Sequence, residues 1–393
     1  MALPRLPPEL LDIIVSYLSP NENSFETSVL YACALTCKAL VSPAQTCIFR
    51  SLSLPSSICV PIAKVKLEST PRIRKLIKRV LLVEYRHPWI SQAEELPHLL
   101  RMLCPSVISL DIFQRRDKQE TPRFNYPSLA ELKCLEEIKL REEENGPPRH
   151  GDIAFPTLLQ HFPKLRAVTF DVVETNRVLD GNDGVNSMKI AAPVFQLDFL
   201  EVQYCDDAVL LDWLVPALRF LRTFRIWYPT PECLASCAAV VRFTVAAGTS
   251  LQHLEVVSVN NATDADLRAL MSAIRTYSKN LRSLSLMVDG NISERSPIQV
   301  IIKSLTFLDA HPHIEHITIQ CFQRNTFVEG NPWSDLEDVL LDTRFPALRS
   351  VELRLLLYNF NDVPAAAIEP YIAVVPRLRQ KRMIFVCHAR WGR

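Results

Sequence analysis

Residues 251–286 read LQHLEVVSVNNATDADLRALMSAIRTYSKNLRSLSL and contain one complete structural repeat. At each end stands a triplet of apolar residues spaced i, i+3, i+5, the first being Leu251, Leu254 and Val256. The last two members alternate with polar residues at a period of two, which is typical of a β-strand. Between the triplets, Thr263 is a helix N-cap candidate, and the apolar residues after it follow the i, i+3, i+4, i+7 spacing of an amphipathic helix over 264–277. The stretch therefore predicts a strand, a helix and a second strand.

The same triplet recurs along most of the chain. Its ten copies begin at residues 77, 107, 135, 165, 197, 221, 251, 281, 314 and 348, at intervals of 24 to 34 residues. A strand followed by a helix at a period of about 30 residues is typical of a repeat solenoid, in which each repeat needs its neighbours to bury its apolar faces. We therefore expect an α/β fold with parallel strands on a concave face and helices outside. Residues 383–386 are expected to add a terminal strand.

Several helix boundaries are marked between the triplets. Ser296-Pro297 and the stretch 230–232 each place proline in the first turn of a predicted helix, and Gly248 is expected to end the second of these helices. Ser334 and Glu337 have the spacing of a capping box. The competing fold is a doubly wound α/β sheet, which also alternates strands and helices. We favour the solenoid because the chain has only eight glycines and no Gly-rich binding turn.

The N-terminal residues follow a different pattern. Residues 6–18 read LPPELLDIIVSYL and predict one short helix with only a narrow polar stripe. A surface helix normally has an apolar face about 100° wide, so we expect one side of this helix to pack internally and another to meet a partner. A second helix is predicted with Leu30, Ala34 and Leu35 on one side, and a third is predicted to start at Ser42-Pro43 and to run to Leu52.

These residues resemble an F-box. The matching elements are Leu6-Pro7-Pro8-Glu9-Leu10-Leu11, Ile14 to Leu18, Leu35-Thr36-Cys37-Lys38 and Ile48-Phe49-Arg50-Ser51-Leu52. Leu40 stands where a tryptophan is common, and the loop after the first helix is longer than usual. The resemblance implies that these helices recruit a Skp-type adaptor, and through it the cullin and RING subunits of a ubiquitin ligase. By match to the family motif, the adaptor-binding residues are Leu6, Pro7, Leu10, Leu11, Ile14 and Leu18. The alternative is an ordinary N-terminal capping helix.

The repeats resemble leucine-rich repeats of the long, irregular kind found behind F-boxes, notably in the expanded F-box families of fungi. The usual Asn or Cys after the strand is mostly missing, so the resemblance lies in period and pattern. The expected organisation is an F-box three-helix domain over 1–52, a linker or joining helix over 53–76, and an irregular solenoid of about ten units over 77–393.

Composition restricts the partners and the compartment. The 44 basic and 43 acidic residues nearly cancel, so nothing favours binding to nucleic acid or to an acidic membrane surface. No apolar run approaches the ~20 residues that span a bilayer, and the sequence shows no secretory signal pattern. The eleven cysteines are scattered without a CxxC pair. We therefore expect reduced thiols and a cytoplasmic or nuclear location, or both.

Motifs for catalysis, cofactors or metals are not found. The sequence contains no P-loop, G-x-G-x-x-G, G-x-S-x-G or H-E-x-x-H, so we expect a protein that is not an enzyme and needs no cofactor. The histidine cluster 311–316 is interpreted as a surface turn rather than a metal site, and the cysteine pairs 33/37 and 233/237 as buried small hydrophobes. The basic run 72–79 is interpreted as a solvated helix face, with a nuclear signal or a site for an acidic partner as the alternative.

Side chains that alternate with the core triplets are expected to line the concave face and to bind a protein substrate. The residues predicted to contact this substrate are Asp111, Phe113, Arg225, Trp227, His253, Glu255 and His316. The patch of Arg225, Trp227, His253 and Glu255 is the preferred hot spot, since Trp and Arg are over-represented among hot-spot residues. The alternative for each residue is ordinary solvated surface.

The function expected from these features is that of a non-catalytic substrate-recognition subunit of an SCF (cullin–RING) ubiquitin ligase. One alternative is a protein-interaction scaffold unrelated to ubiquitin, which would bind another protein without any ligase. The other is an enzyme on a misread α/β fold, which would need a pocket lined by convergent polar groups.

Overall fold

The computed structural model describes residues 7–17, 28–85, 89–116, 126–144, 155–171, 191–203, 208–227, 234–257, 263–288, 297–323, 332–357, 373 and 375–390. The chain forms two compact units, here called the first unit (Met1–Gly146 with His161–Lys164) and the second unit (Pro147–Gln160 with Leu165–Arg393). Among the described residues, no helix has both the length and the apolar character needed to cross a membrane.

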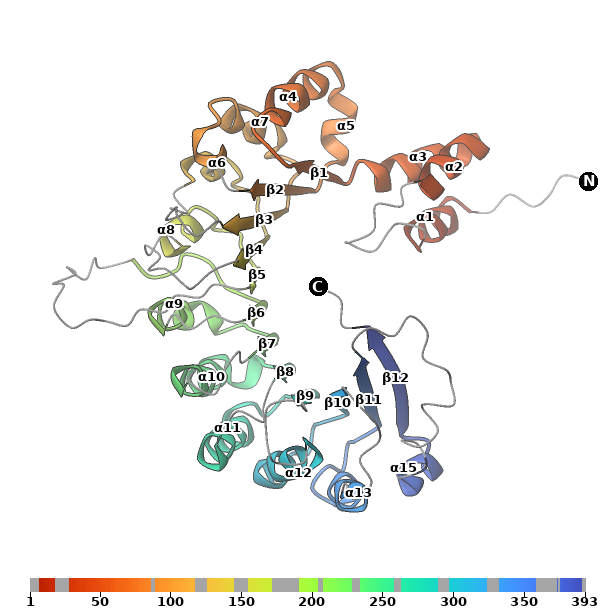
Figure 1. The fold of residues 1–393 in the computed structure, drawn as a ribbon, viewed down its shortest axis with the longest axis vertical. Coiled ribbons are helices and arrows are strands. Elements are labelled where there is room, and N and C mark those ends of the chain that lie inside the picture. Colours follow the sequence, from red (N-terminus) through yellow and green to blue (C-terminus); the bar gives the residue numbers. More distant parts are fainter. Residues whose placement is uncertain are drawn as a thin grey trace, which may run out of the picture. The chain divides into compact units, whose positions relative to one another are not determined.

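The first unit joins three N-terminal helices to four parallel strands. Its elements are α1 (Pro8–Tyr17), α2 (Ser28–Thr36), α3 (Lys38–Ile48), β1 (Ser51–Leu54), α4 (Cys59–Ser69), α5 (Pro71–Leu76), β2 (Arg79–Tyr85), α6 (Trp89–Gln92), α7 (Leu96–Leu103), β3 (Ser109–Arg116), η1 (Pro127–Glu131) and β4 (Glu137–Glu144). The strands lie side by side in chain order, and each pairs in parallel with the next (Figure 1).

The second unit contains eight parallel strands, again in chain order. Its elements are α8 (Phe155–Leu159), β5 (Ala167–Asp171), β6 (Phe199–Gln203), α9 (Ala208–Leu214), η2 (Val215–Leu218), β7 (Thr223–Trp227), α10 (Leu234–Ala247), η3 (Gly248–Ser250), β8 (His253–Val257), α11 (Asp264–Tyr277), β9 (Ser283–Val288), α12 (Pro297–Leu308), β10 (His316–Gln323), α13 (Trp333–Leu341), β11 (Ser350–Leu357), α15 (Pro376–Gln380) and β12 (Ile384–Arg390). Helices α9 to α13 each pack against the next along one side of the strands (Figure 1).

The apolar triplets form the core, as their spacing predicts. Every triplet position is buried except Leu348, which is half-buried. The strand register places equivalent positions side by side, so that Phe224, Leu254 and Leu284 form one continuous apolar layer. The strands of each unit follow chain order, without the reversal that defines a doubly wound sheet. The result is an all-parallel α/β arrangement that is compatible with a solenoid.

Two predicted helix starts are confirmed. Thr263 caps α11 in a capping box with Asp266, whose backbone N–H donates to the Thr263 hydroxyl at 3.2 Å. Pro297 is the first residue of α12. The predicted start over 230–232 lies outside the described residues, and Gly248 follows α10 with a positive φ of 53°. The terminal strand predicted near residue 383 is β12.

Three local predictions on helices are wrong. α3 begins at Lys38, so Pro43 lies inside the helix, because an earlier start lets Leu40 and Ala44 pack on the small core of α1 and α2. Leu35, expected to share the packed side of α2, is exposed. Ser334 lies inside α13, which Pro332 precedes as N-cap, and it forms no capping box because the Glu337 carboxylate is buried and engaged elsewhere.

The predicted boundary between the F-box and the linker falls inside a strand. Residue 52, the last residue assigned to the N-terminal domain, is the second residue of β1. Leu52 pairs with Val80 of β2, so the sheet of the first unit begins one strand earlier than the first apolar triplet indicates. The stretch 53–76, expected to be a linker or joining helix, holds the two helices α4 and α5.

Candidate functional site

The three N-terminal helices share a very small core. Its fully buried members are Val15, Leu30 and Ala44, one from each helix. Leu40, Cys47 and Ile48 of α3 pack against them and are only partly buried. Because few apolar side chains fit into so small a centre, most of the apolar surface of α1 is left outside it.

The exposed apolar residues of α1 form a helical stripe. Leu10 is 44% exposed, Ile13 49% and Ile14 45%, and their i, i+3, i+4 spacing places them on one face of the helix. Of the other predicted adaptor contacts, Pro7 is exposed and Leu11 is half-buried, whereas Leu6 and Leu18 lie outside the described residues. Ile13 joins the stripe although the motif match does not include it. Leu40, at the tryptophan position of the F-box pattern, is half-buried against the core.

A charged cluster lies on the polar face of the first unit. This face of the sheet is formed by the side chains that alternate with the buried triplet residues along each strand. Asp111 of β3 is fully buried between Arg79 of β2 and Arg141 of β4. Its Oδ2 accepts from Arg79 Nη2 at 2.6 Å, its Oδ1 accepts from Arg141 Nε at 3.0 Å, and Arg141 Nη2 donates to Oδ2 as well. The Asp111 carboxylate is thus covered, and the two arginines are the groups that reach the surface.

Aromatic side chains and a second buried carboxylate lie further along these strands. Phe113 packs edge-on against the exposed Tyr85 ring, with 6.2 Å between the centroids. Glu84 is buried and accepts from the backbone N–H of Ile90 at 3.0 Å. It also accepts from the Gln114 amide at 2.6 Å and from the Tyr126 hydroxyl at 2.9 Å. Three donors compensate for the cost of burying this carboxylate, so the network stabilises the fold.

On the second unit, the predicted hot spot contains an alternating charge ladder. Arg225 of β7 lies in register between Glu201 of β6 and Glu255 of β8. Its guanidinium is 3.2 Å from Glu255 and 3.7 Å from Glu201, and it lies 5.5 Å from the centroid of the Phe199 ring. These contacts hold the Arg225 side chain in place while almost half of it stays exposed.

The ladder continues across the next strands through Gln320. Its Nε2 donates to Glu255 Oε1 at 2.8 Å and to the Ser285 hydroxyl at 2.9 Å. Gln320 is buried, and alternation with its triplet predicts only the face on which it lies, because its partners are 65 and 35 residues away. Trp227, half-buried on β7, lies next to Val257 in the register.

Two histidines lie on the same face. His253 and His316 occupy equivalent positions on β8 and β10, with Ser283 of β9 between them. Burial lowers the pKa of His253, and the charges of His316, Arg282 and Arg225 lower it further. His316 Nδ1 lies 2.6 Å from the Ser350 hydroxyl. The predicted contacts Arg225, Trp227, His253, Glu255 and His316 are therefore brought together on one polar face.

The histidine cluster does not gather into a metal site. His311 is buried, with Nε2 3.0 Å from the Ser278 carbonyl, whereas His313 is exposed and His316 lies on β10. Within the described ranges, no three His, Cys, Asp or Glu side chains are grouped so that they could hold a metal ion. The prediction that Cys33 and Cys37 are both buried is wrong, because Cys37, which lies between α2 and α3, is exposed.

The basic run 72–79 is divided between two environments. Arg72 and Lys75 on α5 and Lys78 after it are exposed, as a solvated helix face requires. Arg79 instead lies on β2 and bonds Asp111.

No protein-family model matches the chain, and no curated protein matches it either.

Proposed function

We propose that this chain is the non-catalytic substrate-recognition subunit of an SCF (cullin–RING) ubiquitin ligase that acts in the cytosol or the nucleus. In this proposal, α1 to α3 are an F-box that binds a Skp-type adaptor. The parallel strands and helices that follow are a leucine-rich-repeat-like solenoid whose polar face binds a protein substrate. The observation that carries the proposal is the solvent-facing stripe of Leu10, Ile13 and Ile14 within a sequence that resembles the F-box motif.

The stripe is suited to binding another protein. Fully burying an aliphatic side chain is worth about 1.5–3 kcal/mol, so covering three half-exposed ones is worth roughly 3 kcal/mol. Val15, on the opposite side of α1, is fully buried, which fixes the direction in which the stripe points. An adaptor that covers the stripe would gain this energy without reorganising the three-helix core.

The polar face of the second unit is suited to recognition rather than to catalysis. It offers an arginine held between two glutamates, together with Phe199 and the half-buried Trp227. Arginine and aromatic residues carry much of the binding energy in protein interfaces. The contribution of such a receptor to ubiquitin transfer is to raise the effective concentration of substrate lysines near the charged ubiquitin carrier.

Co-expression of the full chain with a Skp-type adaptor, followed by affinity purification, tests the proposal. We expect a stoichiometric complex with the wild type and at least a hundredfold weaker binding for Leu10→Asp, because a carboxylate would be buried in an apolar interface. Val194→Asp is the matched control, since Val194 is an exposed aliphatic residue of the second unit. It should leave the complex intact.

A folded, soluble wild type that forms no complex would contradict the proposal. The second candidate, a scaffold unrelated to ubiquitin, would then be favoured. Its supporting observation is Leu40 in place of the tryptophan of the F-box pattern, half-buried against the helical core. In that case the Leu10 stripe should capture a different protein, and Leu10→Asp should abolish that capture instead.

A further inference from the structure

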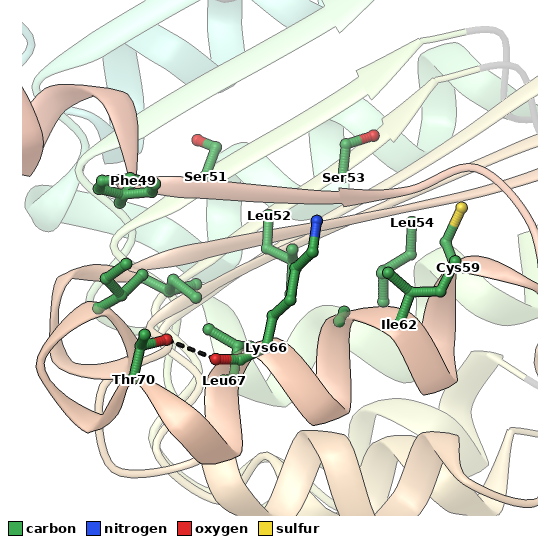
Figure 2. Close-up of a pocket in the computed structure, with 13 residues that line it drawn as sticks. Phe49, Ser51, Leu52, Ser53, Leu54, Cys59, Ile62, Lys66, Leu67 and Thr70 are labelled. Atoms are coloured by element: carbon green, nitrogen blue, oxygen red, sulfur yellow. Dashed lines mark hydrogen bonds between the residues drawn. The ribbon is translucent and has the colours of Figure 1, made fainter.

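An apolar cavity opens between strand β1 and helix α4 of the first unit. Its volume is about 290 Å³. Its wall includes Phe49, Leu52, Leu54, Ile62, Ala63 and Leu67. Figure 2 shows Leu52 and Leu54 pointing from β1 towards α4, while Ser51 and Ser53 point to the other side of the strand. The cavity is therefore the unfilled end of the apolar layer that β1 begins.

Strand β1 also has an unused edge. It pairs with β2 on one side, and no other strand among the described residues pairs with it. The Arg50 carbonyl accepts from the backbone N–H groups of Lys78 and Arg79, so it points towards β2. Because backbone groups alternate in direction along a strand, the N–H and C=O groups of Ser51 and Ser53 point away from β2. An incoming strand can pair with them.

One cation stands beside the cavity. Lys66 reaches from α4 towards β1 next to Leu52 (Figure 2), and it contributes to the cavity wall. Its backbone carbonyl accepts from the hydroxyls of Ser69 and Thr70, but no ion pair joins its ammonium group to any residue in the described part of the chain. The site thus combines apolar volume, main-chain donors and acceptors, and one positive charge.

We propose that β1 is the docking site of an extended acidic peptide, which adds to the sheet as a further strand and places apolar side chains in the cavity. Side chains alternate along a strand, so residues in register with Leu52 and Leu54 point towards the cavity and must be apolar. An Asp or Glu two positions from either apolar residue shares their face of the strand and pairs with Lys66. The recognised pattern is therefore three alternate residues on one face, two apolar in succession and one acidic before or after them.

The cavity favours a peptide over a free small molecule. Drug-sized ligands occupy pockets of about 300–1,000 Å³ that enclose most of their surface, whereas this cavity of about 290 Å³ is at the lower limit of that range and lies beside an open strand edge. In strand addition, the main-chain bonds supply affinity and side-chain pockets supply specificity. Both parts are present at β1, and neither involves the Leu10 stripe, so the inference stands independently of the proposed function.

Selection from a library of random linear peptides on the immobilised full chain tests the inference. We expect the selected peptides to share the apolar-x-apolar pattern, with an Asp or Glu two residues before or after it. Fluorescence anisotropy with a labelled consensus peptide should show at least about tenfold weaker binding to Ala63→Trp, which fills the cavity, and to Ser53→Pro, which removes an outward N–H. Ser53→Ala keeps that N–H and should bind like the wild type.

Charge reversal tests the role of Lys66. Lys66→Glu should change the selected preference from acidic to basic residues, whereas Lys75→Glu, an exposed lysine of α5 outside the cavity, should leave it acidic. Circular dichroism checks that each variant is folded. Failure to enrich any shared pattern, or binding that survives both Ala63→Trp and Ser53→Pro, would overturn the inference. Self-association of the wild type that Ala63→Trp abolishes would also overturn it, because the occupant would then be a second copy of the chain.

Discussion

Replacing Asp111 by asparagine should destabilise the first unit by about 3 kcal/mol. The carboxylate is fully buried and accepts from Arg79 at 2.6 Å and from Arg141 at 3.0 Å. Asparagine keeps the shape, but it loses the charge and turns an amide N–H₂ towards guanidinium donors. Breaking one partner out of a buried ion pair costs about 3–5 kcal/mol. The arginines are 19% and 32% exposed and keep some hydration, so the lower end of that range applies.

Urea unfolding followed by far-UV circular dichroism measures this loss. With a slope of about 2 kcal/mol per molar urea, a loss of 3 kcal/mol lowers the midpoint of the first unit by about 1.5 M. Glu131→Gln is the control in the same unit, because Glu131 is 29% exposed and its partner Arg101 is 65% exposed, whereas Asp111 is fully buried, and it should move the midpoint far less. If Asp111→Asn costs less than about 0.5 kcal/mol, the typical effect of a surface substitution, the arginine pair does not hold the three strands together.

Two further predictions concern the second unit. Burial lowers the pKa of His311, whose Nε2–H donates to the Ser278 carbonyl at 3.0 Å, so the unfolded chain protonates this ring before the folded chain does. The stability from this group is present above its ordinary pKa near 6.5 and is lost as the pH falls through the lowered pKa of the folded state. The urea midpoint should therefore drop more between about pH 7.5 and 5 in the wild type than in His311→Gln. Equal drops in the two proteins would refute this prediction. Glu337 Oε1 accepts from the backbone N–H of Leu378 at 2.7 Å, and its Oε2 accepts from Arg377 Nε at 2.9 Å. Glu337→Gln turns an amide N–H₂ towards one of these donors, so it should speed hydrogen exchange in α15 and β12. Asp338→Asn, at an exposed carboxylate that also pairs with Arg377, should speed it far less.

The core of both units could be predicted from the sequence because two patterns agree there. Alternation along each strand places Phe224 and Ile226 on one face, and the repeat interval places Leu254 and Val256 beside them. A shift of one residue in either pattern would turn every side chain of the strand to the other face. The apolar triplets therefore determine the register before any tertiary contact is known.

The polar groups could not be placed in the same way. Asp111 was expected to meet a substrate, but Arg79 and Arg141 cover it from strands whose residues are 32 and 30 positions away. Glu337 had capping-box spacing, yet it binds the backbone N–H of Leu378, 41 positions later. In both cases a contact with a residue distant in the sequence replaced the predicted one, and single-sequence patterns describe local contacts only.

The direction of α1 could be predicted only in part. Its composition indicated more apolar surface than a small domain can bury, and the structure leaves Leu10, Ile13 and Ile14 exposed. Which apolar residue packs inside could not be deduced, because the helix is apolar around most of its circumference. Val15 takes that position, opposite Leu30 and Ala44.

The arrangement of polar and apolar surface bears on how a receptor of this kind would select its substrate. On the polar face of the second unit, Arg225 is already paired with two glutamates, and Gln320 already bonds Glu255 and Ser285. A substrate that binds there must exchange these bonds for its own, and each exchange gains only about 0.5–1.5 kcal/mol. Such a face discriminates against wrong partners more than it adds affinity. We therefore expect a substrate to require an apolar anchor against Phe199 or Trp227, so that removing that anchor weakens binding more than removing any single charge.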